Sequence, residues 1–273
     1  MGNALRKHWP EYLIEAFCLG VFMISAGAFT ALFEYPQSPV NQAIANPDLR
    51  RALIGLAMGL TAMGLIYSPW GQQSGAHMNP AVTLTFFRLG KVPKWDAVFY
   101  IAAQFIGGLL GVLLTRAVLG SCFADPAVDY VVTVPGAPGV VVAFAAELLI
   151  SCGLMLVILT AINTPKLARY TGIFAGTLVA LYITFEAPYS GMSINPARTV
   201  ASALPSGVWT AVWIYFIAPI GGMLLAVDMR RALLQNAHLA CAKLHHHNDR
   251  RCIFCGFAGN QKKRPARFEQ SAA

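Results

Sequence analysis

The stretch GAHMNPAVTL (residues 75–84) has a counterpart in GMSINPARTV (residues 191–200), and both contain Asn-Pro-Ala at the same place. Proline fixes its own φ and disfavours the helical region for the residue before it, so each motif predicts a turn. Each turn runs into a short apolar segment. The repetition indicates that two parts of the chain share one local design.

The composition of the chain is typical of a membrane protein. Of its 273 residues, 56% are hydrophobic and 12% are charged, and the mean hydropathy is +0.56. A soluble domain carries about 25% charged residues. Six stretches are nearly free of charge, and most reach the length of about 17–25 residues that a helix needs to cross a bilayer. They are 11–33, 52–68, 97–119, 140–162, 172–188 and 208–227.

These stretches predict an all-α membrane protein with six transmembrane helices. In a soluble protein, six consecutive buried helices would all have to lack a polar face, which is rare. The first stretch contains Glu11 and Glu15, and no cleavage site follows a short apolar core. We therefore interpret it as a span and not as a signal peptide.

The basic residues predict the orientation. If the spans alternate from a cytoplasmic N-terminus, the segments 1–10, 88–96, 163–171 and 228–273 lie inside and hold 16 of the 20 Lys and Arg residues. The loop 120–139 on the other side holds two aspartates and no base. The positive-inside rule then places both termini in the cytoplasm, and we expect a plasma or inner membrane. Bases scattered over short loops and a tail argue against a nucleic-acid partner.

The spans divide into two similar halves of about 11–119 and 140–227. Glu15 in the first span corresponds to Glu147 in the fourth, and the second and fifth spans each carry two glycines four residues apart. Three spans are an odd number, so the second half is inverted relative to the first, which places a shared site near the bilayer midplane. The glycines are Gly55, Gly59, Gly172 and Gly176. They predict that the second and fifth spans cross closely.

Each Asn-Pro-Ala motif is followed by a segment too short to span a bilayer, roughly Pro80–Leu89 and Pro196–Leu204. Such re-entrant half-helices are tolerated where their entry loops line a water-filled cavity. Asn79 and Asn195 are expected to cap the two helices with their side-chain oxygens and to keep their NH₂ groups free as donors. The two positive helix ends would then attract a water oxygen and repel cations and protons.

At this point the chain resembles the aquaporin, or major intrinsic protein, family. The resemblance covers about residues 8–228 and rests on NPAVT (79–83) and NPAR (195–198). It implies six tilted helices plus two half-helices in an inverted repeat, one pore per subunit and a homotetramer. It also implies a channel that needs no cofactor for transport. The implied pore motif is Asn79, Pro80, Ala81, Asn195, Pro196 and Ala197.

Arg198 directly follows the second motif. An arginine deep in an apolar loop is costly unless it faces a polar cavity, and the resemblance implies that it forms a selectivity filter near the outer mouth. Similar water-selective channels carry a histidine and an aromatic residue at the filter, where this chain has Ile183 and Met58. Met192 completes the predicted filter.

The permeant predicted from these residues is water. The alternative is a broader channel for small neutral solutes such as glycerol, urea, ammonia and metalloid acids, because apolar side chains beside Arg198 suit amphipathic solutes. The glycerol-facilitator pattern has an aspartate after the arginine, where this chain has Thr199. A secondary transporter is a further alternative, although the spans offer few ionisable groups for a coupling ion. The spans contain no nucleophile–base set or metal motif that would predict an enzyme.

Glu15, Glu147 and Glu186 are acids that lie within the spans. Glu15 and Glu147 are interpreted as structural buried acids that accept hydrogen bonds from the loops, with a proton path as the alternative. For Glu186 we expect a hydrogen-bonded carboxylate that braces the loop, or alternatively one that shapes the outer vestibule.

The tail, residues 228–273, lies outside the resemblance. Cys241 and His245 are four residues apart, as on one helix face, and Cys252-x-x-Cys255 has the spacing of a zinc knuckle. These four residues predict a structural zinc site, with His246 or His247 as substitutes for His245. The alternative is a basic tail that lies on anionic membrane lipid with incidental cysteines.

Overall fold

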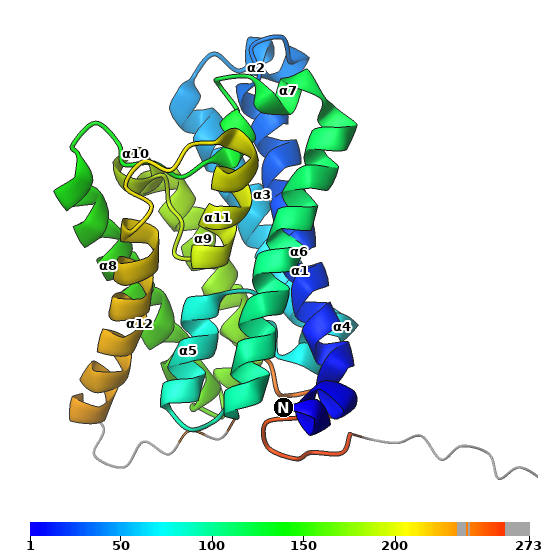
Figure 1. The fold of residues 1–273 in the computed structure, drawn as a ribbon. Coiled ribbons are helices and arrows are strands. Elements are labelled where there is room, and N and C mark those ends of the chain that lie inside the picture. The colour runs from blue at the N-terminus through cyan, green and yellow to red at the C-terminus, as the bar shows by residue number, and fades with distance from the viewer. Residues whose placement is uncertain (234–238, 240, 260–273) are drawn as a thin grey trace, which may run out of the picture.

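The computed structural model describes residues 1–233, 239 and 241–259, and within these ranges the chain forms helices, turns and loops without strands (Figure 1). The long helices are α1 (Gly2–Glu34), α3 (Pro47–Tyr67), α6 (Lys94–Leu119), α8 (Val140–Ile162), α9 (Thr171–Phe185) and α12 (Ile214–Leu233). The shorter helices are α2 (Pro39–Ala43), α4 (Pro69–Ser74), α5 (Pro80–Arg88), α7 (Ser121–Ala124), α10 (Ala187–Ser190) and α11 (Pro196–Ser206). The predicted all-α fold with long helices and two half-helices is confirmed.

Five of the described helices are long and apolar enough to cross a membrane: α1, α3, α6, α8, and α9 together with the turn before it. Helix α12 has 20 residues, but Asp228, Arg230 and Arg231 occupy its C-terminal turns. The predicted span 208–227 begins too early, because residues 207–213 form a loop and α12 starts at Ile214. Helix α1 begins well before the predicted start of its span, so residues 2–10 continue that helix.

Both half-helices start at the proline of an Asn-Pro-Ala motif. The side-chain oxygen of Asn79 accepts the N–H of Ala81 at 2.9 Å, and that of Asn195 accepts the N–H of Ala197 at 3.0 Å. Proline suits the first helical position because it has no N–H that would need a partner. The predicted N-caps are confirmed, and in Figure 1 α5 and α11 lie one above the other in the middle of the bundle.

Close approach of backbones explains three of the four glycines in α3 and α9, whereas a Cβ on Gly172 would meet the side chains of Ile66 and Tyr67. A Cβ atom built on Gly59 would lie 2.5 Å from the carbonyl oxygen of Gly176, and one built on Gly55 would lie 2.6 Å from that of Ala180. Any larger residue would push the helices apart. The predicted crossing of these two spans is confirmed.

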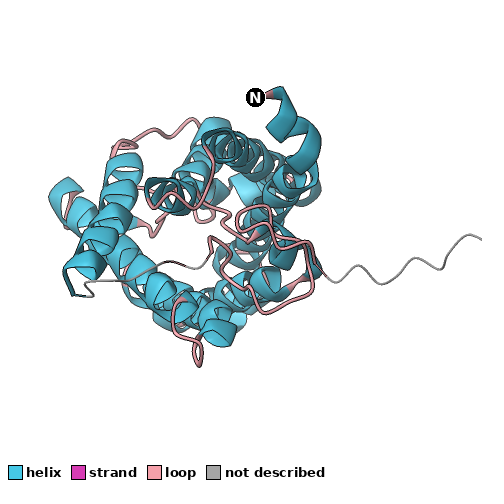
Figure 2. Cartoon of the chain, turned by 90° about the horizontal axis from the view of Figure 1, so that it is seen from below, coloured by secondary structure: helices cyan, strands magenta, loops and turns pink. Residues whose placement is uncertain are grey.

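The other long helices pair in the same symmetric way, α1 with α6 in the first half and α8 with α12 in the second. Figure 2 shows the helices arranged in a ring when the molecule is viewed from the side where α1 begins. We call this side the tail side. Large apolar side chains are exposed on the helices, as expected for surfaces that contact lipid or other subunits. They include Leu60, Ile106, Leu114, Val141, Phe185 and Ile217.

Candidate functional site

The two loops before the half-helices share one unusual backbone conformation. The φ angle is 55° at Ala76 and 49° at Met78 in the first loop, and 47° at Met192 and 50° at Ile194 in the second. Non-glycine residues rarely adopt such angles, and each costs about 1–3 kcal/mol. Contacts around the loops must therefore hold them in place.

A buried carboxylate braces each loop from behind. Glu15 accepts the backbone N–H of Met78 at 2.6 Å and that of His77 at 3.1 Å. Glu147 accepts the N–H of Ile194 at 2.7 Å in the other half. Side chains add further hydrogen bonds to both carboxylates. Glu15 accepts from Ser74 Oγ and Gln104 Nε2, and Glu147 accepts from Ser190 Oγ. These contacts fit the structural interpretation of both acids.

The capping asparagines also bond across the two halves. The Nδ2 of Asn79 donates to the carbonyl oxygen of Ile194 at 2.7 Å, and the Nδ2 of Asn195 donates to that of Met78 at 2.8 Å. The prediction that these NH₂ groups stay free as donors is therefore only half right, since the opposite loop uses one hydrogen of each. One hydrogen of each amide remains as a donor.

A cavity of about 450 Å³ runs past both asparagines. Glu34 and Arg51 line one part of it, and Leu244 of the tail lines another. The structure brings the predicted motif and filter side chains onto this single cavity; they are Asn79, Asn195, Arg198, Met58, Ile183 and Met192. The motif alanines, Ala81 and Ala197, are fully buried within the protein.

Arg198 supplies a donor to the cavity. Its Nη1 atom is buried and has no hydrogen-bond partner within the described part of the chain. A buried donor of this kind is satisfied by whatever polar molecule enters the cavity. The two carboxylate oxygens of Glu186 are also buried without a hydrogen-bond partner among the described residues. Glu186 lies near the hydroxyl of Ser190, but no hydrogen bond of ordinary geometry joins its carboxylate to the loop among these residues.

The tail returns to the helical body of the protein. We call residues 241–259 the tail segment, and Figure 1 shows it on the tail side, next to the start of α1. The N–H of Leu244 donates to the carbonyl oxygen of Gly75 at 3.1 Å. The ring of Phe254 stacks on that of His77, with centroids 5.5 Å apart. The tail segment therefore lies directly against the first loop.

His77 contacts the tail segment both by a hydrogen bond and by ring stacking. The sequence had not pointed to this residue. Its Nε2 lies 2.8 Å from the carbonyl oxygen of Ala242, and its Nδ1 lies 3.1 Å from the Oγ1 of Thr83. A signal existed in the sequence, because the first loop has this histidine where the second has Ser193. Only the first loop offers a ring to the tail.

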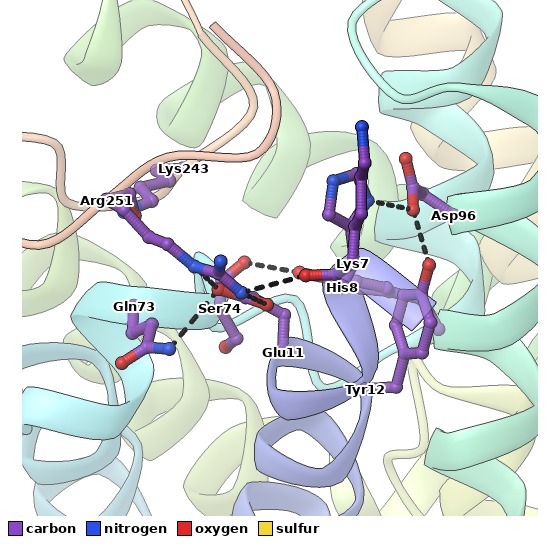
Figure 3. Close-up of polar contacts among 10 residues, drawn as sticks. Lys7, His8, Glu11, Tyr12, Gln73, Ser74, Asp96, Lys243 and Arg251 are labelled. Carbon is purple, nitrogen blue, oxygen red and sulfur yellow. Dashed lines mark hydrogen bonds and ion pairs between the residues drawn. The ribbon is translucent and has the colours of Figure 1, made fainter. Parts of the chain in front are cut away.

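An ion pair anchors the tail segment to α1 (Figure 3). Arg251 binds the buried Glu11 with two hydrogen bonds, Nη2 to Oε2 at 2.6 Å and Nε to Oε1 at 2.7 Å. The hydrogen bonds to Glu11 raise the pKa of Arg251 above its ordinary value. Lys243 donates from Nζ to the carbonyl oxygen of Arg251 at 2.6 Å. This bond joins the first part of the tail segment, which contains Lys243, to the second part, which contains Arg251.

The tail segment gathers four side chains that can bind a metal ion. One ligand atom from each of Cys241, His246, Cys252 and Cys255 lies within 4.8 Å of the others. His245, the fourth ligand predicted from the spacing, is not in this group, and its ring contacts Tyr67 instead. The reason is that residues 241–248 form no helix, so a spacing of four does not put two side chains on one face. The substitute His246 takes the place.

The family model described as major intrinsic protein matches residues 5–228. Among curated relatives, the maize aquaporin NIP2-3 is 34% identical over 209 residues, 76% of this chain and 67% of that protein. The Arabidopsis aquaporin NIP6-1 is 36% identical over 208 residues, 75% of this chain and 63% of that protein.

A solved structure supports the same fold. The aquaglyceroporin from Plasmodium falciparum superposes with a TM-score of 0.70 over 85% of this chain and 99% of that chain. The two sequences are 19% identical, so this likeness concerns the fold alone.

Proposed function

Because the chain belongs to the major intrinsic protein family and is therefore a membrane channel and not an enzyme, we propose that its permeant is water. The observation that carries the proposal is the set of donors on one cavity. Asn79 and Asn195 each keep one N–H, and Arg198 adds an unpaired Nη1. A small neutral molecule with acceptor oxygens satisfies all of these groups in turn.

The charges around the cavity support a neutral permeant. Two helix N-termini and the Arg198 guanidinium present positive potential to the same space, which disfavours cations and protons. We propose that Arg198, Ile183, Met58 and Met192 together form the selectivity filter, since all four line the cavity. The motif asparagines act at its centre.

The interactions of the buried acids argue against a secondary transporter. Glu15 and Glu147 already accept N–H groups from the loops and hydroxyl groups from neighbouring serines. A coupling ion would have to displace these donors and release the strained loops. Passive flow through a standing cavity is therefore the better proposal.

A broader channel for small neutral solutes is the second candidate. Met58, Ile183 and Met192 give the wall beside Arg198 an apolar, adaptable surface, which suits amphipathic molecules such as glycerol, urea, ammonia or metalloid acids. The curated relatives named above carry the name aquaporin, which is compatible with either candidate.

Stopped-flow measurement on proteoliposomes tests the proposal. We expect osmotic water flow well above that of empty vesicles, with weak temperature dependence. Glycerol, urea and ammonia fluxes are measured in the same vesicles. Glycerol or urea flux above the control without added water flux would replace water by the second candidate. Saturable uptake with steep temperature dependence would contradict the channel.

We further propose the arrangement of the channel in its membrane. Residues 11–227 form the channel domain, and residues 1–10 and 228–273 lie in the cytoplasm beside the tail side. The exposed apolar helix surfaces support a homotetramer surrounded by lipid. Chemical cross-linking in native membranes tests the tetramer, and protease access to sealed vesicles tests the orientation.

A further inference from the structure

The tail segment contains a complete set of ligands for one ion. The two closest pairs are Cys241 Sγ with Cys252 Sγ at 3.4 Å and His246 Nε2 with Cys255 Sγ at 3.1 Å. In a tetrahedral zinc site, bonds of about 2.3 Å to sulfur and 2.0–2.1 Å to nitrogen separate the ligand atoms by about 3.5–3.8 Å. The four ligand atoms lie within 4.8 Å of one another, so small rotations that separate the two closest pairs and bring the wider pairs together give the spacing that zinc requires.

The ligand types select the metal. Three thiolates and one imidazole form a set of soft and borderline donors, which favours Zn²⁺ over Mg²⁺ or Ca²⁺. Four protein ligands leave no position for water or substrate, as in a structural site. All six cysteines of the chain are free thiols, so no disulfide competes for these sulfurs in the structure.

The four ligands come from two separate parts of the tail segment, 241–246 and 252–255. Cys241 and His246 flank Leu244, which lines the channel cavity. Cys252 and Cys255 flank Phe254, which stacks on His77. An ion bound to all four would join residues 241–246, which include the cavity-lining Leu244, to residues 252–255, which include Phe254 against the first loop.

The segment needs such a link because it has no regular secondary structure between residues 241 and 259. It is attached to the body by the Arg251–Glu11 ion pair, by the bond from Leu244 to Gly75 and by the contacts of His77 with Ala242 and Phe254, all of which involve side chains or single bonds. A metal that closes a loop without helices or strands stabilises its fold by the free energy of binding.

We propose that Cys241, His246, Cys252 and Cys255 bind one Zn²⁺ and that this ion holds the tail segment across the tail-side end of the cavity, with Leu244 in place. The inference goes beyond the proposed function and does not rest on the identity of the permeant. It makes two separate claims, metal binding and clamping of the segment.

Metal analysis of the full-length chain, purified from zinc-supplemented cells without a histidine tag, tests the first claim. We expect about one equivalent of zinc per chain, and less than half of the wild-type content in Cys252→Ser/Cys255→Ser. The matched control Cys122→Ser/Cys152→Ser changes two cysteines outside the cluster and should keep the zinc. His246→Ala should lose the metal and His245→Ala should keep it. Wild-type protein without zinc, or a Cys252→Ser/Cys255→Ser variant that keeps it, would overturn the site.

Size-exclusion chromatography and circular dichroism establish that each variant is folded. If the double cysteine variant does not fold, cobalt substitution of the wild-type chain decides the question. Co²⁺ bound by three thiolates gives intense sulfur-to-metal charge-transfer absorption and tetrahedral ligand-field bands. Their absence after metal exchange would overturn the ligand set.

Limited trypsin digestion tests the clamp. Lys243 is 2% exposed, whereas Lys94, the first residue of α6, is exposed. Removal of zinc by a chelator should accelerate cleavage after Lys243 severalfold and leave the rate at Lys94 unchanged, and added Zn²⁺ should restore protection. Equal cleavage after Lys243 with and without zinc, in protein shown to bind the metal, would overturn the clamp.

Discussion

The Nδ2 atom of Asn79 lies 2.7 Å from the carbonyl oxygen of Ile194, so the residue that caps one half-helix is bonded to the loop of the opposite half. Asn195 makes the reciprocal bond to Met78 at 2.8 Å. Each asparagine thus satisfies its own helix and joins the two halves. The channel centre depends on both roles at once.

Asn79→Ala should therefore destabilise the protein more than loss of an ordinary cap. Removing a cap costs about 1 kcal/mol, and leaving the buried Ile194 carbonyl without its donor adds about 1–3 kcal/mol. The matched control is Asn46→Ala, because Asn46 caps α3 at an exposed position without a cross-loop bond. Thermal unfolding in detergent measures both, and equal shifts would contradict the double role.

Arg198→Ala should relax selectivity while water flow persists. The substitution removes a fixed positive charge and the bulk that narrows the cavity, so larger neutral solutes and protons should pass more readily. Solute-uptake and proton-leak assays on proteoliposomes measure the change. Arg116→Ala, outside the cavity, is the control. A folded Arg198→Ala channel with wild-type selectivity would remove Arg198 from the filter.

Ile183→His should sharpen the preference for water over glycerol. An imidazole in place of the apolar side chain adds a donor or acceptor to the wall and disfavours carbon-bearing solutes. Ile173→His, on the exposed side of the same helix, should have no effect on selectivity. The ratio of water to glycerol permeability is the measured quantity. If both variants keep the wild-type ratio, Ile183 does not contact the permeant.

Glu147→Gln should lower the melting temperature of the protein. A glutamine has one acceptor oxygen, so it cannot receive all of the N–H and hydroxyl groups that the carboxylate binds, and each buried donor left unpaired costs about 1–3 kcal/mol. Glu186→Gln should have little effect, since its carboxylate oxygens have no hydrogen-bond partner within the described residues. Altered proton flux with unchanged stability of Glu147→Gln would favour the proton path instead.

Leu244→Ala should raise water permeability in zinc-loaded protein. Leu244 lines the cavity, so a smaller side chain widens the tail-side end even when the segment stays docked. Phe257→Ala, an exposed residue of the same segment, is the control. Stopped-flow light scattering gives the comparison. Identical permeability of both variants and the wild-type channel would show that Leu244 does not restrict the flow.

Periodic and repeated features made the long helices and the inverted repeat predictable. Charge-free stretches locate spans by composition alone, and Asn79 and Asn195 mark helix starts by local capping chemistry. The same local reasoning missed α2, α4, α7 and α10, which contain four to six residues each. Helices this short are fixed by tertiary contacts and leave no periodic signal.

Long-range hydrogen bonds could not be predicted from the sequence either, because they also depend on tertiary contacts. Capping chemistry predicts where the oxygen of Asn79 goes, but its amide hydrogen finds Ile194 only after both halves are assembled. The metal ligands show a further limit. The spacing selected three cysteines that the structure brings together, while the choice between His245 and His246 depended on residues 241–248 not forming a helix.

The cross-loop bonds also constrain how the protein is made. When the ribosome has delivered only residues 11–119, the amide of Asn79 lacks its acceptor and the glycine face of α3 lacks its partner α9. The first half must therefore wait in the membrane with its re-entrant loop incomplete until the second half is inserted. The first loop is complete only once the second loop, which carries Ile194, is in place.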